Sequence, residues 1–351
     1  MTYLFENYKR APIEFVKAEG SYLIDSEGKT YLDFSSGIGV TNLGFQPQVQ
    51  QALIQQAGRI WHSPNPYLSS LQEQVAQELA GSYDYLAFFC NSGAEANEAA
   101  IKLARKATGK QGIITFQQSF HGRTFGAMAA TGQDKIKEGF GDGVPHFSYA
   151  IYNDLASVEK LVNQDTAAVM LELVQGESGV RPAEAAFVKD LADFCRREEI
   201  LLIVDEVQTG MGRTGQLYSF EYYGIIPDIV TLAKGLANGL PSGALLGKSS
   251  LAPAFGPGSH GSTFGGNKLA MAAALETLHI MKEAGFMEEV RSKSAILLEQ
   301  LQFAFQDHPK ISAVRGLGMM IGIETSASLS KIVEAARQKG LIIMPAGENV
   351  N

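Results

Sequence analysis

The sequence predicts an α/β fold in which helices cover both faces of a large, mostly parallel sheet. Short apolar runs are bounded by polar or glycine residues, and stretches with amphipathic periodicity separate these runs along the chain. Apolar runs that alternate with helices indicate a buried parallel sheet, because the crossover helices cover both of its faces. The runs expected as strands are 86–90, 113–116, 167–172, 200–205, 229–233 and 244–247.

The helices expected between these strands lie at 94–106, 155–162 and 187–197. The last part of the chain has a different order of elements. It predicts long helices at 269–282 and 287–305, strands at 311–314 and 319–324, a helix near 329–339 and a strand at 341–344.

These patterns predict two domains. Residues 48–282 would form the large α/β domain, and residues 1–47 and 283–351 would join into a smaller α+β domain. The sequence stops in what reads as a loop entering a strand, so we expect a truncated C-terminus.

Composition and charge narrow the classes of function. The 351 residues are 45% hydrophobic and 19% charged, with a formal net charge of −8. No block of lysine and arginine supplies the basic face that nucleic-acid binding needs, so no nucleic-acid partner is expected. The apolar runs are too short to cross a membrane, and the first residues lack the apolar region of a signal peptide. We therefore expect a cytoplasmic protein without membrane contact.

Cysteine and histidine positions predict no metal or redox site. Cys90 and Cys195 stand alone in apolar segments, which is typical of buried, reduced thiols. The six histidines are scattered without metal-ligand spacing, so no metal is expected. A glycine string at 256–261 fits the dinucleotide-binding pattern, but no clear strand precedes it and no helix starts inside it. A nicotinamide or flavin site is therefore not expected there.

Charged residues follow two of the expected strands at their carboxyl ends. Asp205 ends the strand at 200–205, and Lys234 follows the strand at 229–233. Either residue alone fits a structural role, as a helix cap or a surface lysine. In open α/β sheets, however, ligands bind at the carboxyl ends of strands, and two such strand ends can deliver both side chains to one crevice. The pair therefore indicates a functional site.

Three further segments add groups suited to a phosphorylated, flat ligand. Ser92, Gly93 and Ala94 connect a strand to a long helix, and the start of such a helix offers backbone N–H groups to a phosphate; an ordinary helix cap is the alternative. In the segment at 119–124, Phe120 could stack on a ring and Arg123 could bind a carboxylate. The segment at 260–267 is a hydroxyl-bearing loop.

In this order, the five segments resemble the class III (fold type I) pyridoxal-phosphate aminotransferases, with the closest similarity to their acetylornithine branch. The residues at 88–100, 119–124 and 129–133 are closely similar to the corresponding motifs of that branch. The resemblance runs from about Tyr8 to the last residue. It implies pyridoxal 5'-phosphate as the cofactor.

The resemblance also implies roles around the cofactor ring. Lys234 would bind the cofactor covalently and then act as the base that moves a proton. Asp205 would pair with the ring nitrogen. Gln208 would lie near the ring hydroxyl, while Val207 and Phe120 would pack on the two ring faces.

The phosphate and the substrate would be held by other residues that match the family. Gly93 and Ala94, with Ser92 nearby, would bind the phosphate. Thr263 would reach the phosphate of a neighbouring subunit's cofactor, and Ser262 would touch its substrate, which implies a homodimer with shared active sites.

The resemblance implies a substrate pocket with two carboxylate-binding groups. Arg123 would bind a substrate carboxylate, and Glu177 would pair with a second arginine that lies beyond the point where this sequence stops. The implied reaction moves the terminal amine of N-acetylornithine to 2-oxoglutarate, which gives N-acetylglutamate 5-semialdehyde and glutamate, in arginine biosynthesis. Ornithine, succinylornithine and 4-aminobutyrate remain alternative substrates, and Ile38 weakens the case for free ornithine. A catalytically inactive homologue that acts as a binding protein is the alternative outside this class.

Overall fold

The main body of the molecule is built on a seven-stranded sheet with strand order β4-β12-β11-β10-β7-β5-β6. The computed structural model describes residues 3–347 and 350. Strand β12 runs antiparallel to both of its neighbours, and the other six strands are parallel, which confirms the predicted fold class. The strands are β4 (Tyr85–Cys90), β5 (Gly112–Phe116), β6 (Phe147–Ala150), β7 (Thr166–Leu171), β10 (Leu201–Asp205), β11 (Ile229–Leu232) and β12 (Gly243–Lys248).

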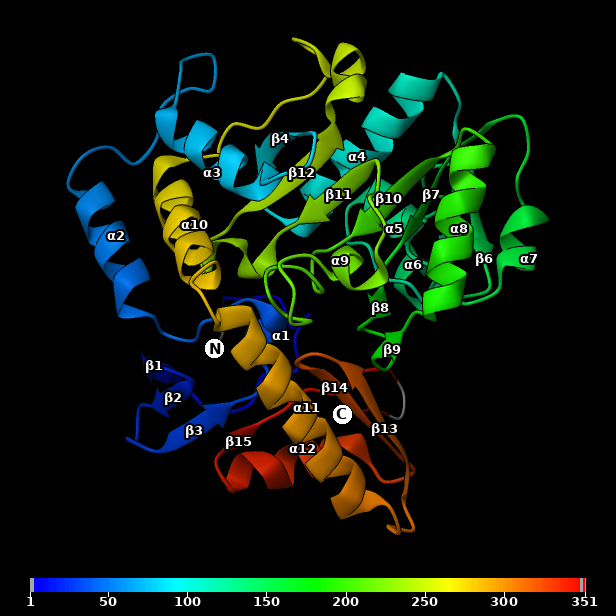
Figure 1. The fold of residues 1–351 in the computed structure, drawn as a ribbon. Coiled ribbons are helices and arrows are strands. Elements are labelled where there is room, and N and C mark those ends of the chain that lie inside the picture. The colour runs from blue at the N-terminus through cyan, green and yellow to red at the C-terminus, as the bar shows by residue number, and fades with distance from the viewer. Residues whose placement is uncertain (1–2, 348–349, 351) are drawn as a thin grey trace.

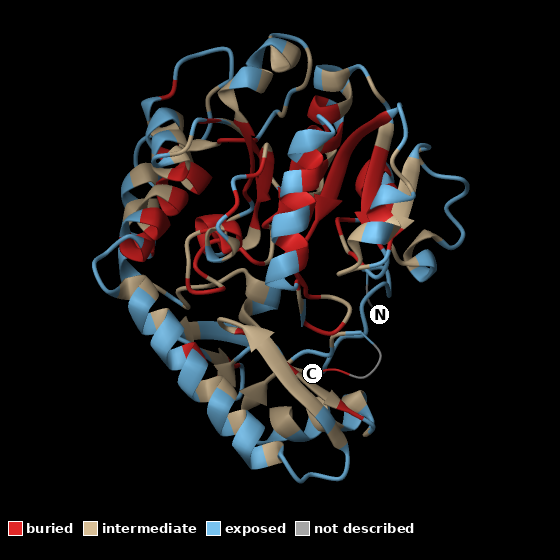
Figure 2. Ribbon diagram, turned by 45° about the vertical axis from the view of Figure 1, so that its right-hand side comes forward, coloured by how far each residue is buried: buried red, intermediate tan, exposed pale blue. Residues whose placement is uncertain are grey.

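Helices cover both faces of this sheet, so neighbouring residues of one strand enter different cores (Figures 1 and 2). In β10, Ile203 packs in one core with the alanines of α4 (Gly93–Thr108). Val204 packs in the other core with α8 (Ala185–Arg197). All residues of β7 and β11 are buried, as expected for central strands without a solvent-facing side. This double cover explains why the strands are continuous apolar runs in the sequence.

Both chain ends contribute to a second, four-stranded sheet with order β1-β2-β3-β15 (Figure 1). Strand β15 pairs in parallel with β3, although about three hundred residues separate them. The neighbouring elements are a β13–β14 hairpin and two helices. Their bounds are β1 (Phe15–Glu19), β2 (Tyr22–Asp25), β3 (Thr30–Asp33), β13 (Ile311–Leu317), β14 (Met320–Thr325), β15 (Leu341–Ile342), α11 (Phe286–Phe305) and α12 (Leu329–Gln338). The division into domains at 47/48 and 282/283 stays a prediction.

Shorter elements connect these parts. The expected helix at 155–162 is only one turn and a half, because it ends at Glu159. Strands β1–β3, the β8–β9 hairpin and β6 were not expected, since they are short and lack a continuous apolar run. The remaining elements are α1 (Ser36–Gly39), α2 (Pro47–Ala57), α3 (Ser70–Ala80), α5 (Phe125–Ala130), α6 (Asp134–Lys137), α7 (Leu155–Glu159), α9 (Ser219–Tyr223), α10 (Lys268–Met281), β8 (Val174–Gln175), β9 (Arg181–Pro182), η1 (Lys234–Ala237) and η2 (Ser249–Phe255).

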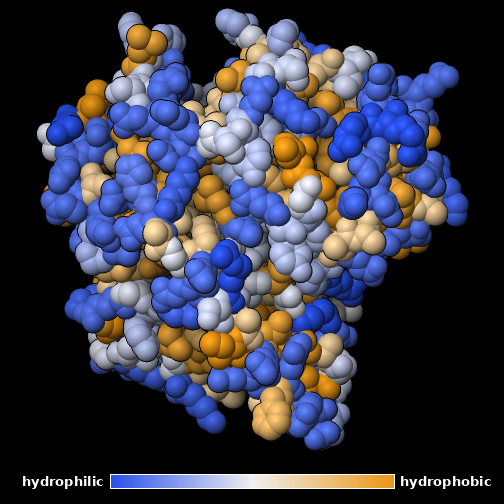
Figure 3. Space-filling model, in the orientation of Figure 1, coloured by the Kyte–Doolittle hydropathy of each residue, from blue (hydrophilic) through white to orange (hydrophobic). Residues whose placement is uncertain are grey.

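The surface is mixed in character. The face drawn in Figure 3 is largely hydrophilic, and hydrophobic residues form separate patches on it. Within residues 3–347 and 350, none of the helices combines the length and apolar character that a membrane span requires.

Candidate active site

Three charged residues converge at the carboxyl edge of the large sheet because of its strand register. Val204 of β10 is paired with Leu171 of β7, so the next residues, Asp205 and Glu172, lie side by side. Asp205 is itself paired with Thr231 of β11, three residues before Lys234. The sheet therefore brings Asp205 and Lys234 to one place, as the strand-end argument predicted.

A cavity of about 470 Å³ opens at this edge. It contains ten of the twelve residues predicted for the site. These are Ser92, Gly93, Ala94, Phe120, Arg123, Glu177, Asp205, Val207, Gln208 and Lys234. The other two, Ser262 and Thr263, are not among the residues that line it.

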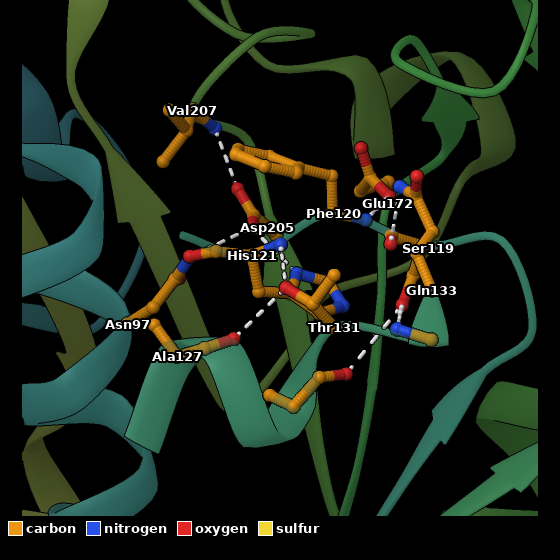
Figure 4. A network of polar contacts seen from close by, with 12 residues as sticks. Asn97, Ser119, Phe120, His121, Ala127, Thr131, Gln133, Glu172, Asp205 and Val207 are labelled. Carbon is orange, nitrogen blue, oxygen red and sulfur yellow. Dashed lines mark hydrogen bonds and ion pairs between the residues drawn. The ribbon is translucent and has the colours of Figure 1, made fainter. Parts of the chain in front are cut away.

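Asp205 is the best-anchored group of the cavity (Figure 4). Its Oδ2 accepts hydrogen bonds from Asn97 Nδ2 at 2.8 Å and from His121 Nδ1 at 2.7 Å. Its Oδ1 accepts from the backbone N–H of Val207 at 3.0 Å. Three donors around a carboxylate that is only 3% exposed fix both its position and its orientation.

His121 and Asn97 hold the Asp205 carboxylate, a role that the sequence did not assign to them. His121 is held in turn by its backbone N–H, which donates to Thr131 Oγ1 at 2.9 Å. Each of the two side chains also keeps one buried polar atom without a partner in the described structure: His121 Nε2 and Asn97 Oδ1. Both residues belong to the segments at 88–100 and 119–124, which the sequence analysis singled out. It did not show that their side chains reach Asp205.

Lys234 occupies a strained position at the end of β11. Its φ is 46°, in the left-handed region that a lysine rarely adopts. Burial lowers the pKa of its ammonium group, whereas the nearby carboxylates of Glu177, Asp205 and Glu172 raise it. A buried amine with a lowered pKa is a better nucleophile and base near neutral pH than a surface lysine.

Glu172 is a third acidic group that the sequence reasoning did not place in the site. Burial raises the pKa of its carboxyl well above the usual range, and the neighbouring Asp205 raises it further. Its Oε2 accepts a hydrogen bond from the backbone N–H of Phe120 at 2.9 Å. The run at 167–172 ends in this carboxylate, so the strand-end argument used for Asp205 could have found it.

The start of α4 lines one side of the cavity. Ser92 is the N-cap, and its Oγ accepts from the backbone N–H of Glu95 at 3.2 Å. Gly93 and Ala94 begin the helix and line the cavity. A Cβ on Gly93 would come within 2.6 Å of Val207 Cγ1, so only glycine fits there. The first turn of a helix presents N–H groups without helical partners, which suits a phosphate.

The outer part of the cavity is more open. Arg123 is exposed, and its guanidinium carbon lies 5.5 Å from the centre of the Phe120 ring. Ser262 does not line the cavity, but its Oγ accepts a hydrogen bond at 3.1 Å from Nδ2 of Asn91, which does. Thr263 is exposed on the same loop. Within one chain, the structure brings Arg123 and Glu177 to the cavity but leaves Thr263 outside it.

A larger hollow of about 730 Å³ lies at the opposite edge of the sheet. Tyr85 at the start of β4 and Lys248 at the end of β12 line it, together with Arg196 of α8. Two of its charged groups, Lys248 and Arg196, already form ion pairs with Asp228 and Asp193. Size alone therefore does not mark the site; the convergent, buried acid and amine do.

Comparison with known families agrees with this geometry. The family model described as Aminotransferase class-III matches residues 3–351, and the chain belongs to this family. Class-III aminotransferases depend on pyridoxal phosphate, so the predicted family and cofactor are confirmed.

Named relatives and solved structures are similar to this chain over nearly its whole length. The chain is 67% identical over 350 residues to acetylornithine aminotransferase of Streptococcus mutans serotype c, with 100% of this chain and 92% of that protein covered. A solved structure of N-acetylornithine aminotransferase from Stenotrophomonas maltophilia has a TM-score of 0.84 and 35% identity, and covers 98% of this chain and 90% of that one. For ornithine aminotransferase from Toxoplasma gondii, described with partial occupancy of PLP, the TM-score is 0.94 at 30% identity, and 99% and 86% of the two chains are covered.

The residues present fit pyridoxal phosphate. Gly93 and Ala94 line the cavity at the start of α4, and the missing Cβ of Gly93 leaves its backbone unshielded there. Asp205 offers a buried carboxylate to a ring nitrogen, and Lys234 offers an amine to an aldehyde. A phosphate, a basic ring nitrogen and an aldehyde are the three groups that such a set would hold.

Proposed function

We propose that this enzyme transfers the terminal amine of N-acetylornithine to 2-oxoglutarate, which gives N-acetylglutamate 5-semialdehyde and glutamate, as a step of arginine biosynthesis. The observation that carries the proposal is the convergence of Lys234, Asp205 and Arg123 on one cavity. The name of the Streptococcus mutans relative supports the choice of substrate.

The inner wall would hold the cofactor. Gly93 and Ala94 would bind its phosphate, with Ser92 nearby, and Asp205 would pair with its ring nitrogen. Phe120 and Val207 would pack on the ring faces, and Gln208 would bind near the ring hydroxyl. When bound, pyridoxal phosphate supplies an electron sink for the charge left when a carbon next to the amine loses its proton.

The protein's own part in that chemistry is to place charge and move one proton. Asp205 contributes a fixed negative charge, because Asn97, His121 and Val207 N–H hold its two oxygens. Lys234 would carry the cofactor and then, released, act as the proton carrier, a task that the lowered pKa of its amine favours. Asp205 is buried and Lys234 is half-buried, so both groups have limited contact with bulk water.

The outer wall would select the substrate. Arg123 can bind a carboxylate through two N–H groups of its guanidinium; N-acetylornithine carries one carboxylate, and 2-oxoglutarate carries two. Glu177 would adjust the same pocket between an amine donor and a dicarboxylic keto acid. The acyl group removes the positive charge from the α-amine of ornithine, so we infer that free ornithine is the poorer donor.

The proposal includes a homodimer with shared active sites. Thr263 is exposed and outside its own cavity, as expected for a residue that serves a second copy. Mixing Lys234→Ala and Thr263→Ala chains tests this: if sites are shared, hybrids contain one site with both defects and one with neither, and activity returns. No recovery after verified subunit exchange would contradict a shared site. We also propose a cytoplasmic location, which suits the free buried thiols of Cys90 and Cys195.

Steady-state kinetics with a series of donors test the substrate directly. We expect kcat/KM for N-acetylornithine to exceed that for free ornithine and 4-aminobutyrate by at least about 100-fold, a difference that one mispaired buried charge can supply. Succinylornithine is the closest competitor, because its α-amine is also acylated and uncharged, although its succinyl group adds a second carboxylate. An equal or higher kcat/KM for 4-aminobutyrate would contradict the proposed substrate but leave the proposed cofactor chemistry intact.

A further inference from the structure

The turn that carries Glu177 into the cavity has an unusual backbone. It connects β8 to β9, and the N–H groups of Gly179 and Val180 both donate to the carbonyl of Gly176 at 3.3 Å. Gly179 has a φ of +112° and Val180 a φ of +50°. A positive φ is rare for a β-branched residue and strains the backbone, so other contacts must hold the turn in place.

Those contacts come from the β13–β14 hairpin, far along the chain. Arg315 Nη2 donates to the carbonyl of Gly179 at 2.8 Å, and its Nε donates to the carbonyl of Val180 at 3.1 Å. Both acceptors belong to the two strained residues. Its remaining nitrogen, Nη1, pairs with Glu324 Oε2 on the neighbouring strand. Each of the three guanidinium nitrogens therefore has a partner: two bind the carbonyls of the turn, and the third binds the Glu324 carboxylate, which holds the side chain in place.

Apolar packing supports the same arrangement. Val180 is 9% exposed and forms a small core with Val174 and Met320 of β14. A Cβ on Gly322 would come within 2.9 Å of Val180 Cβ, so the hairpin lies directly against the turn. The opposite side of the turn lies against Gln208 of the inner wall, because a Cβ on Gly176 would come within 1.5 Å of Gln208 Oε1.

We propose that Arg315 is a positioning residue for Glu177: it fixes the strained Gly179–Val180 turn and thereby sets how the cavity discriminates between its two substrates. Arg315 is not among the residues that line the cavity, so it acts through the turn and not by touching substrate. The inference rests on the proposed function, in which Glu177 adjusts the pocket between the amine donor and the keto acid.

Amide hydrogen exchange tests the contact without reference to activity. In Arg315→Met we expect the amides of Gly179 and Val180 to exchange at least about tenfold faster than in the wild type. Arg315→Lys retains a charge for Glu324 but lacks the planar fork, so its exchange rates should lie between the two. The matched control is Arg337→Met, which removes another arginine–glutamate pair, with Glu334, from α12. Unchanged exchange in Arg315→Met would overturn the proposal.

Half-reaction kinetics on the cofactor-loaded enzyme test the consequence for substrate choice. The ratio of single-turnover rates for N-acetylornithine and 2-oxoglutarate should shift about tenfold in Arg315→Met, in the same direction as in Glu177→Gln. The double variant should shift no further than Glu177→Gln alone, because both changes act through one carboxylate. Equal loss in both half-reactions, or additive shifts, would reduce Arg315 to a structural role and contradict the inference.

The two readouts separate this inference from the proposed function. If the wild-type enzyme turned over neither substrate, the proposed function would fail, and the exchange data would still decide whether Arg315 holds the turn. If the wild type turns over both and the ratio is unchanged in Arg315→Met, the proposed function stands and the inference fails.

Discussion

The inner and outer walls of the cavity are built in different ways. On the inner wall, Asp205 is buried and receives three hydrogen bonds from groups on the sheet edge and its covering helices. On the outer wall, Arg123 is exposed and Glu177 sits on a strained turn that a distant hairpin supports. In the proposed mechanism, the cofactor chemistry therefore depends on groups anchored at the sheet edge, whereas substrate choice depends on groups carried by loops.

The largest expected effect concerns Lys234 on the inner wall. Lys234→Ala removes both the group that binds the cofactor and the proton carrier, so turnover should fall by more than about 10⁴-fold. Steady-state turnover and the visible absorbance of the purified protein measure the two losses. Appreciable turnover in this variant would show that the inner wall does not work as described.

Asp205→Asn tests the fixed charge of the same wall while preserving size. We expect kcat to fall about 10³-fold, because an amide cannot keep the ring nitrogen protonated. His121→Asn, which removes one of three hydrogen-bond donors, should cost about tenfold. A smaller loss for Asp205→Asn than for His121→Asn would reverse the assigned order of importance and count against this description.

Arg123 on the outer wall should affect binding more than chemistry. Arg123→Met is expected to raise KM for both carboxylate substrates, with about a 100-fold loss in kcat/KM and a small change in kcat. Arg123→Lys should recover part of the loss, since it restores the charge without the fork. A loss confined to kcat would place Arg123 in the chemical step and contradict the assignment of the outer wall to substrate binding.

Glu172 predicts a small effect on stability that depends on pH. Because its pKa is raised in the folded protein, the unfolded chain releases this proton first as pH rises. Its contribution to stability is therefore full below the unfolded pKa and is lost as pH rises towards the raised folded pKa, by up to about 1.4 kcal/mol per pH unit. Glu172→Gln should flatten the loss, and urea unfolding of both proteins at several pH values measures the difference. Parallel pH curves would argue against a raised pKa.

The inner wall could be predicted from sequence because its signals are local. Asp205 and Lys234 follow apolar runs directly, and strand ends of a parallel sheet meet at one edge. Ten of the twelve residues predicted for the site line the cavity, although the family resemblance alone predicted Val207, Gln208 and Glu177. Glu172 follows the same rule and was missed only because the rule was not applied to its strand.

The supporting contacts could not be predicted in this way. Arg315 lies more than a hundred residues from the turn that it holds, and nothing near it in the sequence points to Gly179. Strands β1–β3 were missed because each has only four or five residues and none forms a long continuous apolar run. Thr263 is exposed and would act in a second chain, so only the family resemblance predicted its role.

The most direct test of the proposed reaction is one half-reaction on the cofactor-loaded protein. N-acetylornithine is added without any keto acid, and the visible absorbance and the aldehyde product are followed. We predict rapid conversion of the cofactor's aldehyde form to its amine form, one N-acetylglutamate 5-semialdehyde per active site, and a much slower response to free ornithine. An unchanged spectrum with N-acetylornithine, together with rapid conversion by another terminal amine, would contradict the proposed substrate.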